Sequence, residues 1–258
     1  KNDYKNTKVI TTLGSIGAML NIQKSNGEKG CNRYIISHNQ SALNILEVFK
    51  MFEVVGWKNP SVDIVPLFET IDDLKNSVSV MENVYNDNTY RLHLESRNNE
   101  QTIMLGFSDG TKDGGYLTAN WNILKSKEAL VKVSSKYGIK LKFFDGRGGP
   151  PARGGGNTHQ FYSSIAGIID TKDIQITIQG QTISSNFGTI DSCQYNLEQL
   201  ISSACKNLEF NSSKNSLSAD NRKTMEMLSK LSFNAYNEFK NHPKFLKYLE
   251  NMSTIKYY

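Results

Sequence analysis

The chain has 258 residues with 38% hydrophobic and 21% charged side chains, which is ordinary for a globular protein and enough for a large core. No apolar run approaches the ~20 residues needed to cross a bilayer. The net charge of +5 is small and the basic residues form no dense cluster in the sequence, so the charge does not establish nucleic-acid binding.

The three cysteines are scattered and odd in number, which fits neither a disulfide framework nor a zinc site. This pattern favours a reducing cytoplasm. The chain starts at Lys1 rather than Met, shows no signal-peptide pattern, and ends at Tyr258 inside a helical pattern. We therefore expect a cytoplasmic protein of which this chain is a piece.

The first two thirds of the chain alternate helix-like and strand-like segments. Strands are predicted over residues 33–37, 62–67, 102–107, 140–145 and 174–179. Helices are predicted over residues 8–23, 71–85, 88–96, 116–137 and 158–168, and from Ala42 to just before Gly56. In the first of these the expected inward side chains are Ile10, Leu13, Ile16 and Leu20; in the Ala42 helix they are Ala42, Leu46, Phe49 and Phe52.

The remaining third is almost wholly helical, with segments over 190–206, 217–240 and 244–252 and Pro243 separating the last two. Five strand–helix alternations predict a parallel α/β sheet. We expect a partial TIM-type (β/α) barrel with additional helices and a helix-rich C-terminal part. Residues 1–258 are interpreted as one catalytic-barrel piece, with strand–helix units and active-face loops in 1–187 and a helical extension in 188–258.

Polar clusters follow all five predicted strands, on the face where barrels and open α/β sheets bind ligands. The most distinctive cluster is residues 144–156, FDGRGGPPARGGG. Glycines let main-chain N–H groups approach a ligand, and the forked guanidinium groups of Arg147 and Arg153 suit phosphate or carboxylate. The pattern therefore predicts an anion-binding loop, and the alternative is an exposed flexible linker. Its six glycines after Asp145 and lack of apolar side chains predict mobility over 146–157 without ligand.

Two carboxylates, Glu69 and Asp109, follow the second and third predicted strands. Carboxylate oxygens suit Mg²⁺, with substrate and water filling the other positions, so we expect both to reach one cation. The alternative is that Glu69 caps the next helix and Asp109 closes a turn. Lys112 lies in a glycine-flanked segment that we expect to be a loop, where it is either a charge for an oxyanion or a solvated surface lysine.

The four histidines lack metal-ligand spacing, and no motif supports a serine or cysteine nucleophile. His93 and His242 are expected to be structural or solvated. His38 and His159 are near the expected active face, but neither is favoured as a catalytic base.

Residues 103–115, IMLGFSDGTKDGG, resemble the phosphoenolpyruvate carboxylase signature (I/V)-M-x-G-Y-S-D-S-x-K-D-x-G, with Phe107 for Tyr and Gly110 for Ser. VPLFET at 65–70 resembles the family's metal-site segment, and 146–155 resembles its G-R-G-G-x-x-x-R-G-G loop. IQGQTI at 178–183 resembles the following T-E-Q-G-E segment.

The resemblance implies a Mg²⁺- or Mn²⁺-dependent enzyme that joins bicarbonate to phosphoenolpyruvate, giving oxaloacetate and phosphate. It implies Glu69 and Asp109 as metal ligands and Lys112 and Arg147 as catalytic groups around the phosphate and the enolate. Arg153, Gly148 and Gly149 would complete substrate binding. Arg153 also matches a position implicated in aspartate inhibition, and the full-length family enzyme is expected to be a homotetramer that binds neither nucleic acid nor membrane.

The chain departs from the family at Asp145, where the family usually has His, and a carboxylate there is expected to weaken the local positive field. The family's T-A-H-P-T segment with its catalytic histidine is not in this chain, so the base lies elsewhere and the piece is expected to be inactive alone. Two alternatives stay open: another metal-dependent barrel enzyme acting on phosphoenolpyruvate, such as a mutase or phosphotransferase, and more remotely an Arg-Gly nucleic-acid module.

Overall fold

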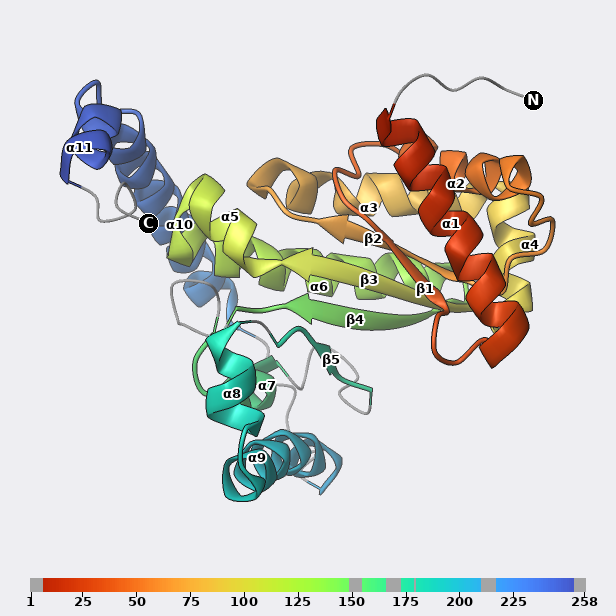
Figure 1. The fold of residues 1–258 in the computed structure, drawn as a ribbon. Helices are drawn as coiled ribbons and strands as arrows, with labels where there is room; N and C mark the ends of the chain where they lie inside the picture. Colours follow the sequence, from red (N-terminus) through yellow and green to blue (C-terminus); the bar gives the residue numbers. More distant parts are fainter. Residues whose placement is uncertain (1–6, 149–154, 166–172, 179, 210–216, 253–258) are drawn as a thin grey trace. The chain divides into compact units, whose positions relative to one another are not determined.

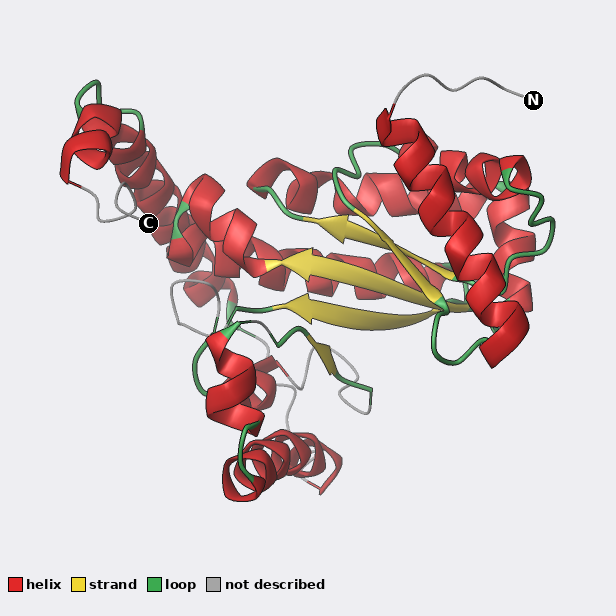
Figure 2. Ribbon diagram, in the orientation of Figure 1, coloured by secondary structure: helices red, strands yellow, loops and turns green. Residues whose placement is uncertain are grey.

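The computed structural model describes residues 7–148, 155–165, 173–178, 180–209 and 217–252. These residues form five strands and eleven helices (Figures 1 and 2). The strands are β1 (Arg33–Ile36), β2 (Asp63–Phe68), β3 (Glu100–Gly106), β4 (Lys140–Gly146) and β5 (Gln175–Ile176). The helices are α1 (Thr7–Asn26), α2 (Ala42–Val54), α3 (Ile71–Asn86), α4 (Asn88–Ser96), α5 (Phe107–Gly114), α6 (Tyr116–Lys136), α7 (Thr158–Ile165), α8 (Gln181–Phe187), α9 (Ile190–Glu209), α10 (Ala219–Lys240) and α11 (Phe245–Met252).

The chain divides into two compact units. The first comprises Lys1–Gly106, Ser126–Gly146 and Ile169–Thr177, and therefore holds the whole sheet. The second comprises Phe107–Lys125, Arg147–Ile168 and Ile178–Tyr258, and in the described residues it is helical. The boundaries between the two units fall after Gly106, Lys125, Gly146, Ile168 and Thr177.

All strands of the first unit are parallel and follow the order β1-β2-β3-β4-β5. The expected parallel α/β sheet is thus confirmed. The inner strands β2 and β3 are buried along most of their length, as expected for a parallel sheet covered on both faces. In contrast, β1 at the edge leaves Ile35 43% exposed.

Helices α3 and α6 lie side by side in this unit and are joined by two buried hydroxyl pairs. The Oγ atoms of Ser77 and Ser126 are 2.8 Å apart, and Tyr85 Oη is 3.0 Å from Ser134 Oγ. Both pairs span 49 residues of sequence, so the two helices run in the same direction. The core of this unit includes buried side chains of β2, β3, α3 and α6: Ile64, Val65, Phe68, Ile103, Leu105, Leu74, Met81, Val84 and Leu130.

In the second unit, α10 lies along the first part of α6. Thr118 Oγ1 donates a hydrogen bond to the Ser229 carbonyl oxygen over 2.9 Å. Glu226 accepts from the Trp121 indole over 2.6 Å and from Lys125 Nζ over 2.9 Å. The Thr118 bond is buried and joins residues 111 apart in sequence, so the tail of the chain is an integral part of this unit.

Several local predictions need correction. In α2 the buried side chains are Ile45, Val48 and Phe52, whereas Ala42, Leu46 and Phe49 are only partly covered. Both sets have helical spacing on one broad apolar stripe, and only the neighbouring elements decide its centre. In α1, Ile16 is buried but Ile10 is 56% exposed.

The short helix α5 occupies a segment expected to be a loop, α8 lies where no helix is predicted, and β5 is shorter than the predicted strand. Neither short helix is long enough for its apolar periodicity to stand out in the sequence. Among the described residues, no helix is long and apolar enough to cross a membrane.

Candidate active site

The carboxyl ends of β2, β3 and β4 form a continuous row. Phe68 is in register with Leu105, Leu105 with Asp145, and Gly106 with Gly146. Glu69, the residue after β2, therefore comes beside Gly106. A Cβ atom on Gly106 would lie 3.1 Å from Glu69 Cγ, which shows how closely the glutamate packs against the end of β3.

Glycine is needed at the end of β4 for steric reasons. A Cβ atom on Gly146 would lie 2.8 Å from the Leu105 carbonyl oxygen and 3.2 Å from Met104 Cε. The first contact is with backbone, which cannot move aside without disturbing β3. The glycine that precedes Arg147 thus lets β3 and β4 approach closely where the loop begins.

The helix after Glu69 is capped by its neighbour. Thr70 Oγ1 accepts from the Asp73 amide, and the Asp73 carboxylate accepts from the Thr70 amide, each over 3.1 Å. This reciprocal capping box satisfies the start of α3. The interpretation of Glu69 as the cap is therefore wrong. The Glu69 side chain is partly buried.

Asp109 and Lys112 lie on α5, not in a loop as expected. Asp109 is in the first turn and Lys112 in the last, which are the favourable ends for a negative and a positive charge on a helix. Lys112 Nζ lies 2.8 Å from Asp109 Oδ1, and the two side chains are 67% and 48% exposed. An exposed pair of this kind contributes only about 0–1 kcal/mol, so an incoming cation or anion could replace it at little cost.

Arg147 directly follows β4 and is only 7% exposed. Its guanidinium carbon lies 4.0 Å from the centroid of the Phe161 ring and 5.9 Å from that of Tyr162, both on α7. Stacking on an aromatic face fixes the plane of the guanidinium fork and limits the entropy lost on binding an anion.

The next residue, Gly148, is buried. The other predicted loop residues, Gly149 and Arg153, lie outside the described residues. The predicted mobility of residues 146–157 concerns a segment of which 149–154 are likewise outside the described part.

Sequence reasoning missed Lys127, a side chain of α6 that is 1% exposed. Its Nζ atom lies 2.6 Å from Asp145 Oδ1, and the Asp145 side chain is 2% exposed. The ammonium group also lies 5.0 Å from the centroid of the Phe143 ring. The expectation that Asp145 weakens the local positive field needs correction, because Lys127 compensates its charge within the same unit. The available signal was a lysine between Ile123 and Leu130 at helical spacing, on the buried face of α6.

His93 is structural, as expected. It is 9% exposed and its ring centroid lies 4.9 Å from that of Phe49 in an edge-on contact. Burial, which disfavours the charged imidazolium, holds the pKa of His93 below its ordinary value. It packs within the helices rather than at the strand ends, so it offers no base for the site.

Hard carboxylate donors suit Mg²⁺ or Mn²⁺, and Glu69 and Asp109 both retain access to solvent. In the described part of the chain, no group of three or more His, Cys, Asp or Glu side chains is arranged to hold a metal ion. A cation held by these two carboxylates alone would need its remaining ligands from substrate and water. Because the two carboxylates belong to different units, their convergence stays a prediction.

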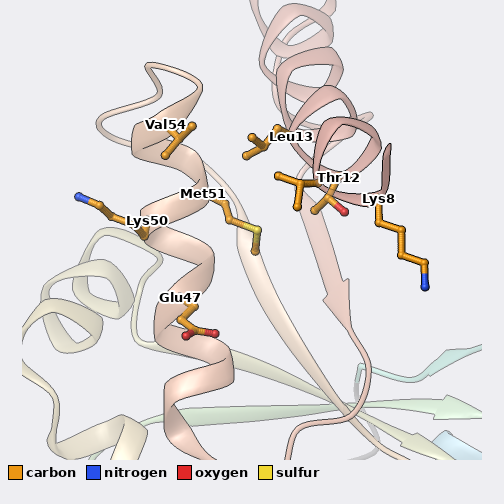
Figure 3. A pocket seen from close by; sticks show the side chains of 8 residues that line it. Lys8, Thr12, Leu13, Glu47, Lys50, Met51 and Val54 are labelled. Atoms are coloured by element: carbon orange, nitrogen blue, oxygen red, sulfur yellow. The ribbon is translucent and has the colours of Figure 1, made fainter. Parts of the chain in front are cut away.

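A surface groove of about 440 Å³ lies between α1 and α2. Figure 3 shows Leu13 of α1 directed toward α2, Met51 of α2 directed toward α1, and Lys50 pointing away. None of the predicted site residues in the described part of the chain lines this groove, so we do not connect it with the chemistry of the strand ends.

Comparison with known families shows a match that covers almost the whole chain. The family model described as phosphoenolpyruvate carboxylase matches residues 3–257. The match includes the strand ends, the Asp109–Lys112 helix and the tail beyond residue 188.

Proposed function

Since the chain belongs to the phosphoenolpyruvate carboxylase family, we propose that it forms the phosphate- and metal-binding part of an enzyme that carboxylates phosphoenolpyruvate with bicarbonate. The observation that carries the proposal is the family match over residues 3–257, which spans every predicted site residue. We further propose that the five-stranded sheet is part of a TIM-type barrel whose other strands lie in a longer protein, and that the piece alone is inactive.

In the proposed reaction, the phosphoryl group leaves the enol oxygen of phosphoenolpyruvate and bonds to a bicarbonate oxygen, giving an enolate and carboxyphosphate. Carboxyphosphate then releases phosphate and carbon dioxide, and the enolate carbon bonds to that carbon dioxide to give oxaloacetate. Each step develops or moves negative charge on oxygen. Cationic donors held in fixed positions stabilise such charge best.

Arg147 is suited to bind the phosphoryl oxygens, because its stack on Phe161 keeps the guanidinium plane fixed before substrate arrives. Lys112 supplies a compact positive charge for the enolate oxygen or the transferred group, after it separates from Asp109. Arg153, Gly148 and Gly149 would enclose the substrate, and Arg153 would also receive an aspartate-type inhibitor. The base is proposed to come from outside this chain.

Glu69 and Asp109 are the proposed ligands of Mg²⁺ or Mn²⁺. When bound, the cation would withdraw charge from the substrate oxygens. The packing of Glu69 against Gly106 supports this assignment, because it limits the freedom of that side chain at the strand end.

Metal binding can be tested without turnover by Mn²⁺ titration followed by electron paramagnetic resonance. Glu69→Gln and Asp109→Asn should each weaken binding by at least about tenfold, the loss seen even for residues that only support metal ligands. Glu53→Gln, at an exposed position of α2, is the matched control. Equal binding by all four proteins would contradict the metal assignment.

Activity is tested by coupling oxaloacetate formation to malate dehydrogenase. The natural-length protein should consume phosphoenolpyruvate only with bicarbonate and a divalent cation, and Lys112→Ala should abolish turnover. Turnover without bicarbonate would favour a mutase or phosphotransferase, neither of which the family match supports. The 258-residue chain alone should not exceed its own Lys112→Ala variant, and a clear excess would show that it holds a complete site.

A further inference from the structure

The last turn of α5, which carries Lys112, is held by two side chains of α10. The Tyr236 hydroxyl donates to the Lys112 carbonyl oxygen over 2.9 Å, and Lys240 Nζ donates to the Asp113 carbonyl oxygen over 2.7 Å. The final carbonyl groups of a helix have no partner within it. Tyr236 and Lys240 therefore act as a C-terminal cap supplied from more than 120 residues away in the sequence.

The contact is close as well as polar. Gly115, just after α5, has a φ angle of +81°, and a Cβ atom there would lie 3.2 Å from Cβ and Cγ of Tyr236. A side chain at this position would thus meet both backbone strain and the tyrosine. The Lys240 ammonium group in turn lies 5.4 Å from the centroid of the Tyr236 ring, so the two capping side chains also support each other.

α5 has little stability of its own. It has eight residues, two of which are the poor helix formers Gly110 and Gly114, and isolated helices of this length do not persist in water. Its first residue, Phe107, is 1% exposed and packs edge-on against Phe161 at a centroid distance of 5.7 Å. Packing thus secures the start of the helix, and the α10 side chains secure its end.

Asp109 and Lys112 lie between these two attachments, on the exposed surface of the helix. The direction of both side chains depends on how the helix is rotated about its axis. A free C-terminal turn would fray, and the Lys112 ammonium group would then sample a wide region instead of one position. Fixed charges stabilise developing negative charge far better than mobile, hydrated ones.

We propose that Tyr236 and Lys240 are positioning residues of the carboxylase site, which hold α5 so that Lys112 and Asp109 meet the substrate and metal in a fixed geometry. The inference rests on the proposed function of these two residues. The proposal also assigns a role to the helical tail, because α10 would support the active site. Both positioning side chains act on main-chain carbonyl oxygens of α5.

Hydrogen exchange measured by NMR or mass spectrometry tests the cap directly on the 258-residue chain. Tyr236→Phe keeps the ring but removes one hydrogen bond and should speed exchange of the amides of residues 111–115 by about three- to tenfold. The double variant Tyr236→Phe/Lys240→Met should speed exchange of these amides further. The single variant Lys240→Arg, which keeps a cationic donor, should retain most of the wild-type protection.

Glu226→Gln is the matched control. It weakens the contacts of α10 with Trp121 and Lys125 but leaves the α5 cap intact. It should therefore speed exchange of the Trp121 indole without changing residues 111–115. Equal loosening of α5 in this variant would show that α10 docking as a whole, and not the cap, fixes α5, and would overturn the proposal.

Turnover is measured in the natural-length enzyme. The double variant should lose about tenfold or more in kcat, as expected for misplaced catalytic groups, while Glu226→Gln and Lys240→Arg keep most of it. Wild-type protein without bicarbonate-dependent turnover would refute the proposed function. An active wild type, together with unchanged exchange and unchanged kcat in the double variant, would refute the positioning role alone.

Discussion

Replacing Lys127 by methionine should destabilise the sheet-bearing unit strongly, because it removes the cation that lies 2.6 Å from the buried Asp145 carboxylate. Methionine keeps most of the aliphatic stem of lysine and so preserves packing against Phe143. The substitution changes mainly charge. Asp145→Asn is the complementary change, since it keeps the shape of the side chain and leaves the lysine in place.

The expected magnitude follows from the depth of the pair. With both side chains at most 2% exposed, the effective dielectric is well below that of water. At an effective dielectric of about 20, charges at this separation attract by about 6 kcal/mol, most of which offsets the cost of taking both ions out of water. Removing one partner leaves that cost for the other, so each single variant should lose about 3–5 kcal/mol of unfolding free energy.

Removing both charges should cost less than removing either. The variant Lys127→Met/Asp145→Asn buries no ion, so we expect it to be more stable than both single variants. Urea unfolding followed by circular dichroism at 222 nm measures all four proteins. If a single variant is already unfolded in buffer, cooperative urea unfolding of the double variant still shows that the double variant is the more stable of the two.

The exposed pair Lys50–Glu53 is the control, since its atoms are 2.7 Å apart but its side chains are 77% and 60% exposed. The urea midpoint of Lys50→Met should equal that of the wild-type protein within experimental error, because solvent screens such a pair. If the effects of Lys127→Met and Asp145→Asn simply add in the double variant, the two charges do not interact in solution, and the reasoning is refuted.

Three further outcomes are expected. Gly146→Ala should cost about 1–3 kcal/mol, seen as a lower calorimetric midpoint, because its Cβ would meet the Leu105 carbonyl oxygen at 2.8 Å; an unchanged midpoint would show that the strands adjust. Burial lowers the pKa of His93, so the unfolded state binds its proton first and stability should fall as the pH drops below about 6.5. The drop in urea midpoint from pH 7.5 to pH 5.5 should be smaller in His93→Gln than in the wild-type protein. An equal drop in both proteins would exclude His93 as its source. Arg147→Lys should raise the KM for phosphoenolpyruvate in the natural-length enzyme about tenfold, because lysine offers no planar fork, and Phe161→Leu should raise it less.

Much of the fold could be predicted from local patterns. The helices α3, α4 and α6 begin at the predicted residues and end within one of them, because caps and apolar spacing lie within a short window of sequence. The strand order and parallel sense follow from strand–helix alternation. The spacing of the glycine loop and the IMLGFSDGTKDGG segment likewise indicated the family that the match over residues 3–257 shows.

Contacts between distant residues decided the rest. The segment SDGTKDG looks like a loop because its two glycines disfavour a helix, yet α5 is helical because Phe107 is buried and Tyr236 and Lys240 cap its end. Lys127 looks like a surface lysine, yet it is buried because α6 passes beside Asp145 at the end of β4. A local pattern records the preference of a residue for helix, strand or solvent. Which distant group satisfies its charge or its backbone depends on the tertiary structure, because those partners lie 18 to 127 residues away along the chain.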